Sequence, residues 1–319
     1  MKSISQLTDF YYKELYPTLQ ELENDRKKIK KRVIYVGIIY LLFVTLIGLA
    51  IYKQLSLDIL FLFAVFILAG MKFIYSYFVD EYSVDFKNKI IAPLINEIDN
   101  NLDYSPHLHI PTAEFNRSKL FSDRPDRVSG NDYVHGKIDD IPILFSDFYA
   151  EKKHTNSRNK ESWEKIFQGL FIISEFPKNF HAQTIVLPDS AQKFFGNLIG
   201  NWLQANNFSR DELVKMDNSE FEKEFVVYST DQIEARYILT PRLMQKLLSY
   251  KKRVKHPLYI SFIGGKIYMA IEYNNDMFEP AIFRSLLEYK IAMDYIQTLH
   301  LAIGVVEELK LNQKLWSKI

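Results

Sequence analysis

The hydrophobic residues of this chain are concentrated in two long runs near its N-terminus. Residues 33–52 carry no charge, and residues 59–79 carry only Lys72. A helix needs about 20 apolar residues to cross the hydrocarbon core of a bilayer, and each run reaches that length. Because only residues 53–58 separate the two runs, the pattern predicts a transmembrane helical hairpin over residues 33–79.

Two other structures would leave a different pattern. A buried hairpin in a soluble protein is typically built from shorter apolar runs. A signal peptide needs a short apolar region near the N-terminus and a cleavage site of small residues, whereas here the mostly polar residues 1–32 come first. The second run follows the first like a stop-transfer segment, so we interpret both as membrane spans.

The basic residues predict the orientation of the hairpin. The positive-inside rule places the basic entrance to the first span in the cytoplasm, and two crossings return the chain to the same side. Lys72 lies about two turns from the cytoplasmic end of its span. Neither run contains an acidic partner for it, so we expect its side chain to snorkel toward the interface. The turn offers only Lys53, whereas six basic residues precede the first span: Arg26, Lys27, Lys28, Lys30, Lys31 and Arg32.

The segments on either side of the hairpin have helical periodicity. Residues 1–32 are predicted to contain a cytoplasmic amphipathic helix, and residues 80–102 a juxtamembrane helix, each interrupted by a proline (Pro17 and Pro93). Their apolar faces could lie on lipid, but acidic residues are interspersed with them. Packing on each other or on the following domain is therefore favoured.

The remainder of the chain is predicted to be an α+β domain. Residues 103–118, with Pro106 and Pro111, form the expected linker, and residues 119–319 the soluble domain. Short segments of alternating hydrophobicity predict a mostly antiparallel sheet, with hairpins at Asp139-Asp140 and Gly264-Gly265. Helices are expected over residues 190–205, from Thr240-Pro241 to Arg253, and in a long C-terminal helix over residues 279–311.

Composition excludes several classes of chemistry. The net charge of +1 gives no overall field for nucleic acid or polyanionic substrates. The chain has no cysteine, which excludes disulfides, thiolate catalysis and cysteine-based metal sites. The basic run Lys251–Lys255 follows a predicted helix. We expect its charges to interact with the C-terminal dipole of that helix or with anionic lipid rather than with nucleic acid.

No motif predicts a catalytic, cofactor-binding or metal site. His107 and His109 would face the same way on extended backbone, but no third ligand is evident. Gly264-Gly265 lacks the strand-to-helix context of a phosphate-binding loop. Asp231, Glu234 and Arg236 form the densest polar cluster. We interpret it as a capping box with a local salt bridge rather than an acid/base pair oriented by Arg236, with Glu234 at the third helical position and Ser229, Thr230 or Asp231 as the cap.

Several short segments resemble a bacterial family of two-span membrane proteins. The C-terminal domain of that family has no assigned function, and its members are often encoded beside LemA-type proteins. The resemblance implies a multi-pass protein of the bacterial cytoplasmic (inner) membrane and no particular activity. Asn131 stands where such proteins often carry an acidic residue. The resembling segments are residues 118–121, 130–136, 167–171, 217–225, 228–231, 234–241 and 315–316.

These observations predict a non-enzymatic, membrane-tethered interaction or scaffold module. The expected contacts are the lipid bilayer and a protein partner or a second copy of the chain, with no nucleic acid. The alternatives are an enzyme acting on a membrane-associated or lipid substrate, and a subunit of a transport or secretion assembly. Two spans cannot enclose a pathway in a monomer, so a transport role would require an oligomer.

Overall fold

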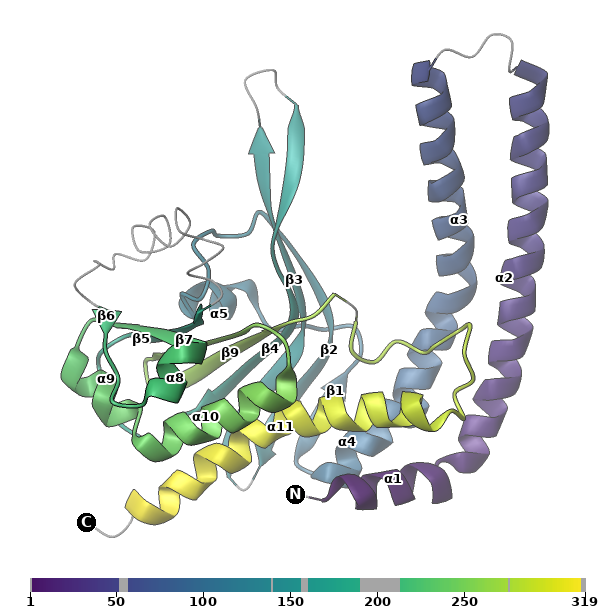
Figure 1. The fold of residues 1–319 in the computed structure, drawn as a ribbon. Helices are drawn as coiled ribbons and strands as arrows, with labels where there is room; N and C mark the ends of the chain where they lie inside the picture. Colours follow the sequence, from purple (N-terminus) through teal and green to yellow (C-terminus); the bar gives the residue numbers. More distant parts are fainter. Residues whose placement is uncertain are drawn as a thin grey trace. The chain divides into compact units, whose positions relative to one another are not determined.

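A computed structural model describes residues 2–51, 57–138, 140–155, 160–189, 213–274 and 276–316. These residues form two compact units, which Figure 1 shows along the chain. The helical unit comprises Lys2–Leu94 and Phe278–Ile296, and the sheet unit comprises Ile95–Met277 and the chain from Gln297 onward. The predicted helix over residues 190–205 lies outside the described residues.

The two apolar runs form the long helices of the helical unit. Helix α2 (Tyr16–Ile51) and helix α3 (Leu57–Phe86) are both long and apolar enough to cross a bilayer. Helix α1 (Ile4–Lys13) precedes them and begins with a capping box. The break between α1 and α2 lies just before Pro17, which occupies the first turn of α2, where a missing N–H costs little. The expectation of two long apolar N-terminal helices is confirmed.

Close packing of α2 on α3 depends on a glycine. The Tyr40 hydroxyl donates a hydrogen bond to the carbonyl oxygen of Phe66 at 2.8 Å. A Cβ atom at Gly70 would lie 2.1 Å from the same hydroxyl, so no larger residue fits there without displacing the tyrosine. Small residues serve this purpose between membrane helices, because they let backbones and polar groups approach closely.

The second proline changes the helical register after α3. Residues Lys87–Ile91 form a π-helical turn, η2, and helix α4 (Ala92–Ile98) follows directly. Pro93 has no N–H to donate, and its ring would clash with the carbonyl four residues back. The chain adapts by widening the turn, with the Ala92 N–H donating to the Lys87 carbonyl five residues back.

A segment from the C-terminal third completes the helical unit. Residues 278–288, here called the strap, contain no α-helix, and helix α11 (Tyr289–Trp316) begins only after them. The predicted start of the last helix at Glu279 is therefore wrong. The physical reason is that Arg26 and Glu23 of α2 bind the strap backbone. Arg26 Nη1 donates to the Ile282 carbonyl at 2.6 Å, and the Leu286 N–H donates to Glu23 Oε2 at 3.1 Å.

Glu23 and Arg26 form a bidentate ion pair inside the helical unit. Their side chains are only 4% and 6% exposed, and their two hydrogen bonds measure 2.8 and 2.7 Å. Burial alone would raise the pKa of Glu23, but hydrogen bonds from Arg26 and the Leu286 N–H hold that pKa below its ordinary value. Every polar group of the pair thus has a strong partner, which a buried charge requires.

Lys87 and Glu279 add a second link between α3, η2 and the strap. Lys87 Nζ lies 2.6 Å from Glu279 Oε1, and Ser83 Oγ donates to Glu279 Oε2 at 2.6 Å. Tyr295 of α11 donates to the Glu279 carbonyl and packs its ring on Phe86. The strap is therefore held at both ends by polar contacts to the base of the helical hairpin, although the Glu279 side chain is 39% exposed.

The sheet unit contains a nine-stranded antiparallel sheet among the described residues. The strand order is β1-β2-β3-β4-β9-β8-β5-β7-β6, and every neighbouring pair is antiparallel. The predicted α+β class and antiparallel pairing are confirmed. The strands are β1 (Leu102–Ser105), β2 (Arg127–Ile138), β3 (Ile141–Thr155), β4 (Glu161–Glu175), β5 (Thr184–Pro188), β6 (Leu213–Val214), β7 (Phe225–Ser229), β8 (Leu258–Ile263) and β9 (Lys266–Glu272).

The predicted linker is part of this unit. Strand β1 pairs with Tyr133–Gly136 of β2, and helix α5 (Thr112–Arg117) buries Phe115 in the core. The ring of Phe115 stacks on Phe148 at 4.6 Å and on Phe121 at 5.1 Å. Residues 103–105 and 112–117 thus have regular structure, and Ile110 and Phe115 of this segment are buried in the unit.

Helices cover both faces of the sheet. Successive residues of β4 from Gly169 to Ser174 are all buried, and they point to opposite faces, which requires cover on each face. Helix α5 supplies it on one face through Phe115. Figure 1 shows helix α10 (Pro241–Val254) and α11 lying across the other face, near the short helices α8 (Ser219–Glu224) and α9 (Gln232–Ile238). Tyr250 of α10 donates to the Leu301 carbonyl of α11 at 2.8 Å.

The Gly264-Gly265 hairpin predicts a position-specific cost. Strands β8 and β9 pair up to Ile263 and Lys266, and both glycines have positive φ (+59° and +74°), as a type I′ turn requires. Gly264→Val or Gly265→Val should each lower the free energy of unfolding by about 1–3 kcal/mol through backbone strain alone, because the space around both positions is open. Gly264→Asn, which tolerates positive φ, should cost much less. Thermal unfolding of the detergent-purified protein measures this, and equal melting of all three variants and the parent would contradict it.

The buried ion pair predicts a larger effect. Arg26→Met removes the bidentate partner of the buried Glu23 carboxylate and leaves it only the exposed Lys27, whose Nζ lies 3.7 Å from Glu23 Oε1, so it should destabilise the helical unit by about 3 kcal/mol. The double variant Glu23→Leu/Arg26→Met should recover part of that loss. The matched control is Lys28→Met, which breaks the exposed pair Lys28–Asp25 (2.9 Å) on the same helix and should cost under about 1 kcal/mol. Melting temperatures in detergent decide between these outcomes, and an Arg26→Met variant as stable as Lys28→Met would refute the role given to the pair.

Candidate functional site

A β-bulge interrupts the pairing of β2 with β3. Asn131 pairs with Asp147, but the next paired residue of β2 is Val134, opposite Phe145. Asp132 inside the bulge has a φ of +57°, unusual for a residue with a side chain. It is fully buried, its N–H donates to the Pro106 carbonyl, and its carboxylate accepts a hydrogen bond from Tyr104. Bulges of this kind redirect side chains and occur frequently next to functional sites.

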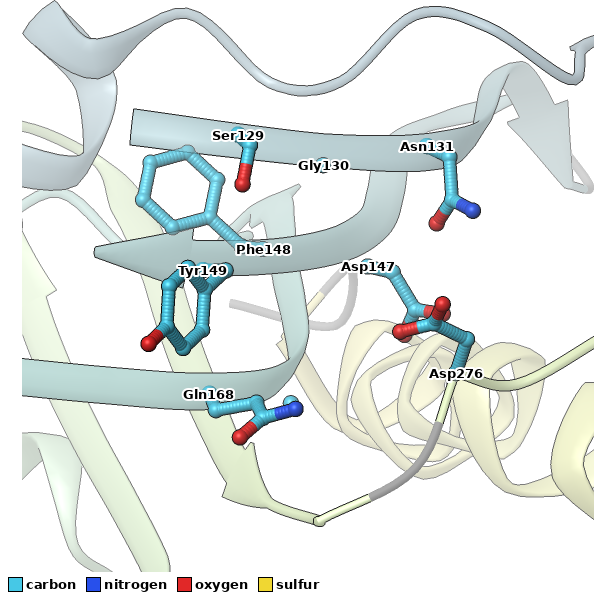
Figure 2. Close-up of a pocket in the computed structure, with 9 residues that line it drawn as sticks. Ser129, Gly130, Asn131, Asp147, Phe148, Tyr149, Gln168 and Asp276 are labelled. Carbon is cyan, nitrogen blue, oxygen red and sulfur yellow. The ribbon is translucent and has the colours of Figure 1, made fainter. Parts of the chain in front are cut away.

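A polar pocket of about 450 Å³ lies beside this bulge (Figure 2). Residues of β2, β3 and β4 supply most of its lining, and Asp276 supplies the remainder from the segment after β9. Figure 2 shows the side chains of Asp147 and Asp276 pointing toward one another, with Asn131 on the adjacent strand. The lining residues are Ser129, Gly130, Asn131, Asp147, Phe148, Tyr149, Gln168, Gly169 and Asp276.

Asp147 is the buried carboxylate of this pocket. The residue is 5% exposed, and its Oδ2 accepts a hydrogen bond from the Met277 N–H at 2.6 Å. Burial, together with the nearby Asp147 carboxylate, raises the pKa of Tyr273 to about 12. The pocket therefore has a negative electrostatic character, which favours cationic or hydrogen-bond-donating groups over anions.

Two glycines bring the strands around the pocket close together. A Cβ atom at Gly130 would lie 2.3 Å from the Asp147 carbonyl oxygen and 2.8 Å from His109 Cβ. Gly169 has a φ of +149°, and its Cβ would lie 2.1 Å from the Ile271 carbonyl oxygen. At both positions the backbone of another strand approaches too closely for a side chain, which explains the glycines.

The arrangement contains binding groups but no catalytic constellation among the described residues. Tyr149 donates to Glu151 Oε1 at 2.8 Å, and this bond raises the pKa of the phenol. Glu151 also accepts a hydrogen bond from Arg127 Nε at 2.7 Å. Hydrolytic chemistry would require a nucleophile, its base and an oxyanion-stabilising group close together. The described residues around the pocket do not bring such a set together.

The sequence-level candidates do not gather in this pocket. His109 Nδ1 lies 2.8 Å from the Ile110 carbonyl oxygen, and its ring packs edge-on against Phe148. His107 and His109 belong to no group of three or more His, Cys, Asp or Glu that could hold a metal ion in the part of the chain that the structure describes. Gly264-Gly265 forms the hairpin turn described above.

The polar cluster of Asp231, Glu234 and Arg236 is structural. Asp231 caps α9, accepting from the N–H groups of Ile233 and Glu234 at 2.7 and 3.0 Å, as predicted. The expected capping box and salt bridge are not found. Glu234 instead accepts from two backbone N–H groups before β5, at 2.9 and 2.6 Å, and Arg236 donates to the Lys215 carbonyl. Glu234 and Arg236 therefore bind distant backbone groups instead of each other.

Lys178 is a buried titratable residue that no sequence pattern distinguished. It is 3% exposed, donates to the Tyr237 carbonyl, and lies 4.3 Å from the centre of the Tyr237 ring. Burial lowers its pKa to about 8. A lysine of this kind is a candidate nucleophile, but it is not among the residues lining the pocket.

The lowered pKa of Lys178 predicts a pH-dependent stability. Between pH 8 and its ordinary pKa of 10.5, the unfolded chain binds more protons than the folded chain, so stability from this residue rises with pH. At pH 7, Lys178→Met should have a higher free energy of unfolding than the parent. This difference should decrease by about 1–3 kcal/mol between pH 7 and pH 10. Lys252→Met, at an exposed lysine of α10, should show no such change. Identical pH profiles for the two variants would rule out the shifted pKa.

Comparison with known proteins finds a family that is similar to the C-terminal part of the chain. Residues 165–311 match the family described as "Protein of unknown function (DUF3137)". This match agrees with the expected C-terminal domain of unassigned function, whereas the LemA association stays a prediction. The matched region begins within β4 and extends through β9, the strap and most of α11.

One solved structure is similar in part. The crystal structure of the mycobacterial trehalose monomycolate transport factor A, TtfA, is 11% identical over 63% of this chain and 86% of its own, with a TM-score of 0.32. A likeness at that level supports no conclusion about fold or function. No curated protein matches the sequence. The comparisons thus connect residues 165–311 to a domain of unassigned function and leave the activity to be argued from the structure.

Proposed function

We propose that this protein is a non-enzymatic interaction module held at the cytoplasmic face of a bacterial inner membrane by α2 and α3. The observation that carries the proposal is the exposure of apolar side chains along both helices. Leu49, Leu68 and Phe73 are each more than 70% exposed within the structure. A continuous apolar surface of this kind needs lipid or protein around it, because soluble proteins rarely leave one open to water.

The ends of the two apolar runs next to the basic residues carry side chains that are typical of a bilayer interface. Tyr35 and Tyr77 are 68% and 71% exposed, and they lie near the end of the hairpin that carries the basic residues. Tyrosine is enriched where hydrocarbon meets head groups. Lys72 is also exposed, which agrees with a side chain reaching toward that interface.

The sheet unit supports an interaction role more than a catalytic one. Its pocket carries polar and acidic side chains without a nucleophile and base, and its titratable clusters serve as caps and structural contacts. An enzyme acting on a membrane-associated substrate is the second candidate, and the pocket beside the bulge is the observation in its favour. A subunit of a transport assembly would need several copies, since one hairpin encloses no path.

Mild detergent extraction followed by mass spectrometry of bound proteins, lipids and small molecules separates these candidates. A stoichiometric protein partner supports the module or subunit. A monomer that retains a small molecule, and loses it in an Asp147→Asn variant, would instead support the enzyme.

The proposed topology predicts opposite locations for two reporters. A fusion after Gln54 should be periplasmic, and a fusion after Ile319 cytoplasmic, because the basic entrance to α2 stays inside. Replacing Lys27, Lys28, Lys31 and Arg32 with glutamine should weaken this bias. Arg26 must be kept, because it is buried in the ion pair with Glu23. Periplasmic labelling at Ile319 in the parent would overturn the orientation.

A further inference from the structure

The strap exposes a phenylalanine and an arginine next to each other. Phe283 is 57% exposed, whereas its neighbour Ile282 is 2% exposed and Leu286 is fully buried. The next residue, Arg284, is also exposed. The two residues therefore lie on an outward-facing loop.

The buried ion pair fixes this loop in place. Arg26 holds the Ile282 carbonyl at 2.6 Å, and Glu23 holds the Leu286 N–H at 3.1 Å. The two anchored backbone groups bracket residues 283–285. Because Ile282 and Leu286 are drawn inward at these points, Phe283 and Arg284 between them are directed outward.

The loop lies beside the membrane-facing part of α3. The ring of Phe283 stacks on Tyr75, with 6.3 Å between ring centres and 19° between ring planes. Tyr75 belongs to the second apolar run, about one turn before Val79, where that run ends. Phe283 therefore occupies the level at which the proposed span leaves the bilayer.

We propose that Phe283 and Arg284 form an interfacial anchor, in which the ring enters the boundary between acyl chains and head groups while the guanidinium binds lipid phosphate. The anchor rests on the proposed membrane hairpin and adds to it a contact from the C-terminal part of the chain. Aromatic and basic residues are the usual pair at this depth, since one prefers the apolar side and the other the charged surface.

A second exposed aromatic residue provides an internal comparison. Tyr289, in the first turn of α11, is 63% exposed, and its ring stacks on Tyr12 of α1 at 6.4 Å. It therefore matches Phe283 in exposure and in having one aromatic neighbour. Its neighbour belongs to α1, which precedes the spans, and so Tyr289 should stay in water.

Tryptophan fluorescence in vesicles tests the anchor with the full chain. The native tryptophans are replaced (Trp163→Phe, Trp202→Phe and Trp316→Phe), and one reporter is introduced as Phe283→Trp, Tyr289→Trp or Leu42→Trp. Vesicles of phosphatidylcholine and phosphatidylglycerol carry bromine either near the head group or near the acyl-chain end. Phe283→Trp should be quenched at least about twofold more than Tyr289→Trp, and more by shallow than by deep bromine. Leu42→Trp should respond mainly to deep bromine.

The outcomes separate the anchor from the membrane hairpin. If Leu42→Trp is quenched while Phe283→Trp behaves like Tyr289→Trp, the anchor is refuted and the hairpin stands. If Leu42→Trp is not quenched, the membrane hairpin fails and the anchor fails with it. Quenching of Phe283→Trp that is equal with and without phosphatidylglycerol would remove Arg284 from the anchor, as would an unchanged lipid dependence in Arg284→Gln.

A stability measurement distinguishes lipid contact from internal packing. Phe283→Ser should leave the melting temperature in detergent unchanged, because the ring is exposed and touches mainly Tyr75. It should nevertheless abolish protection of the strap from protease in vesicles. A large loss of melting temperature would assign Phe283 to the packing of the helical unit instead and overturn the anchor.

Discussion

The ion pair between Glu23 and Arg26 determines how the helical unit is assembled. Its two side chains are nearly inaccessible to solvent, and each uses its remaining hydrogen-bonding capacity on the backbone of the strap. A buried pair of this kind contributes little net stability compared with apolar residues, but it tolerates only one partner geometry. Specificity is therefore its main contribution, since it fixes which part of a distant segment packs on α2 and in what register. Lys87 of η2 adds a side-chain ion pair to Glu279 of the strap, in which only the lysine is buried.

The sheet unit follows a different principle, in which apolar faces and backbone pairing suffice. Local hairpins join some of its strands, such as β8 and β9, and helices on both faces complete the core. Two of its buried polar residues, Asp132 and Asp147, lie in the bulge or directly beside it. The pocket forms at that irregularity. Its acidic lining is consistent with a binding surface, and the buried Lys178 is not among the residues that line it.

Sequence patterns predicted those elements whose cause is local. The two apolar runs, the Thr240-Pro241 helix start and the Gly264-Gly265 turn each depend on residues next to one another, and all three are confirmed. Elements that depend on distant partners were missed. Residues 279–288 have helical spacing, but hydrogen bonds to Glu23 and Arg26 hold them in another conformation. Glu234 and Arg236 were expected to pair, yet the backbone near β5 and the Lys215 carbonyl compete for them. The pocket also escaped prediction, because a bulge leaves no periodic signal.

The division of the chain also has a consequence for the order of events during synthesis. The helical unit uses residues up to Leu94 and then Phe278–Ile296, so Ile95–Met277 of the sheet unit must be translated before the strap exists. At about 5–20 residues per second, this interval is of the order of 10 s or more. During that time Glu23 and Arg26 have each other but not their backbone partners, and α2 and α3 are already complete. The nascent protein must therefore pass through a stage in which the hairpin has been made and its base is still open, closing only when the last third of the chain arrives.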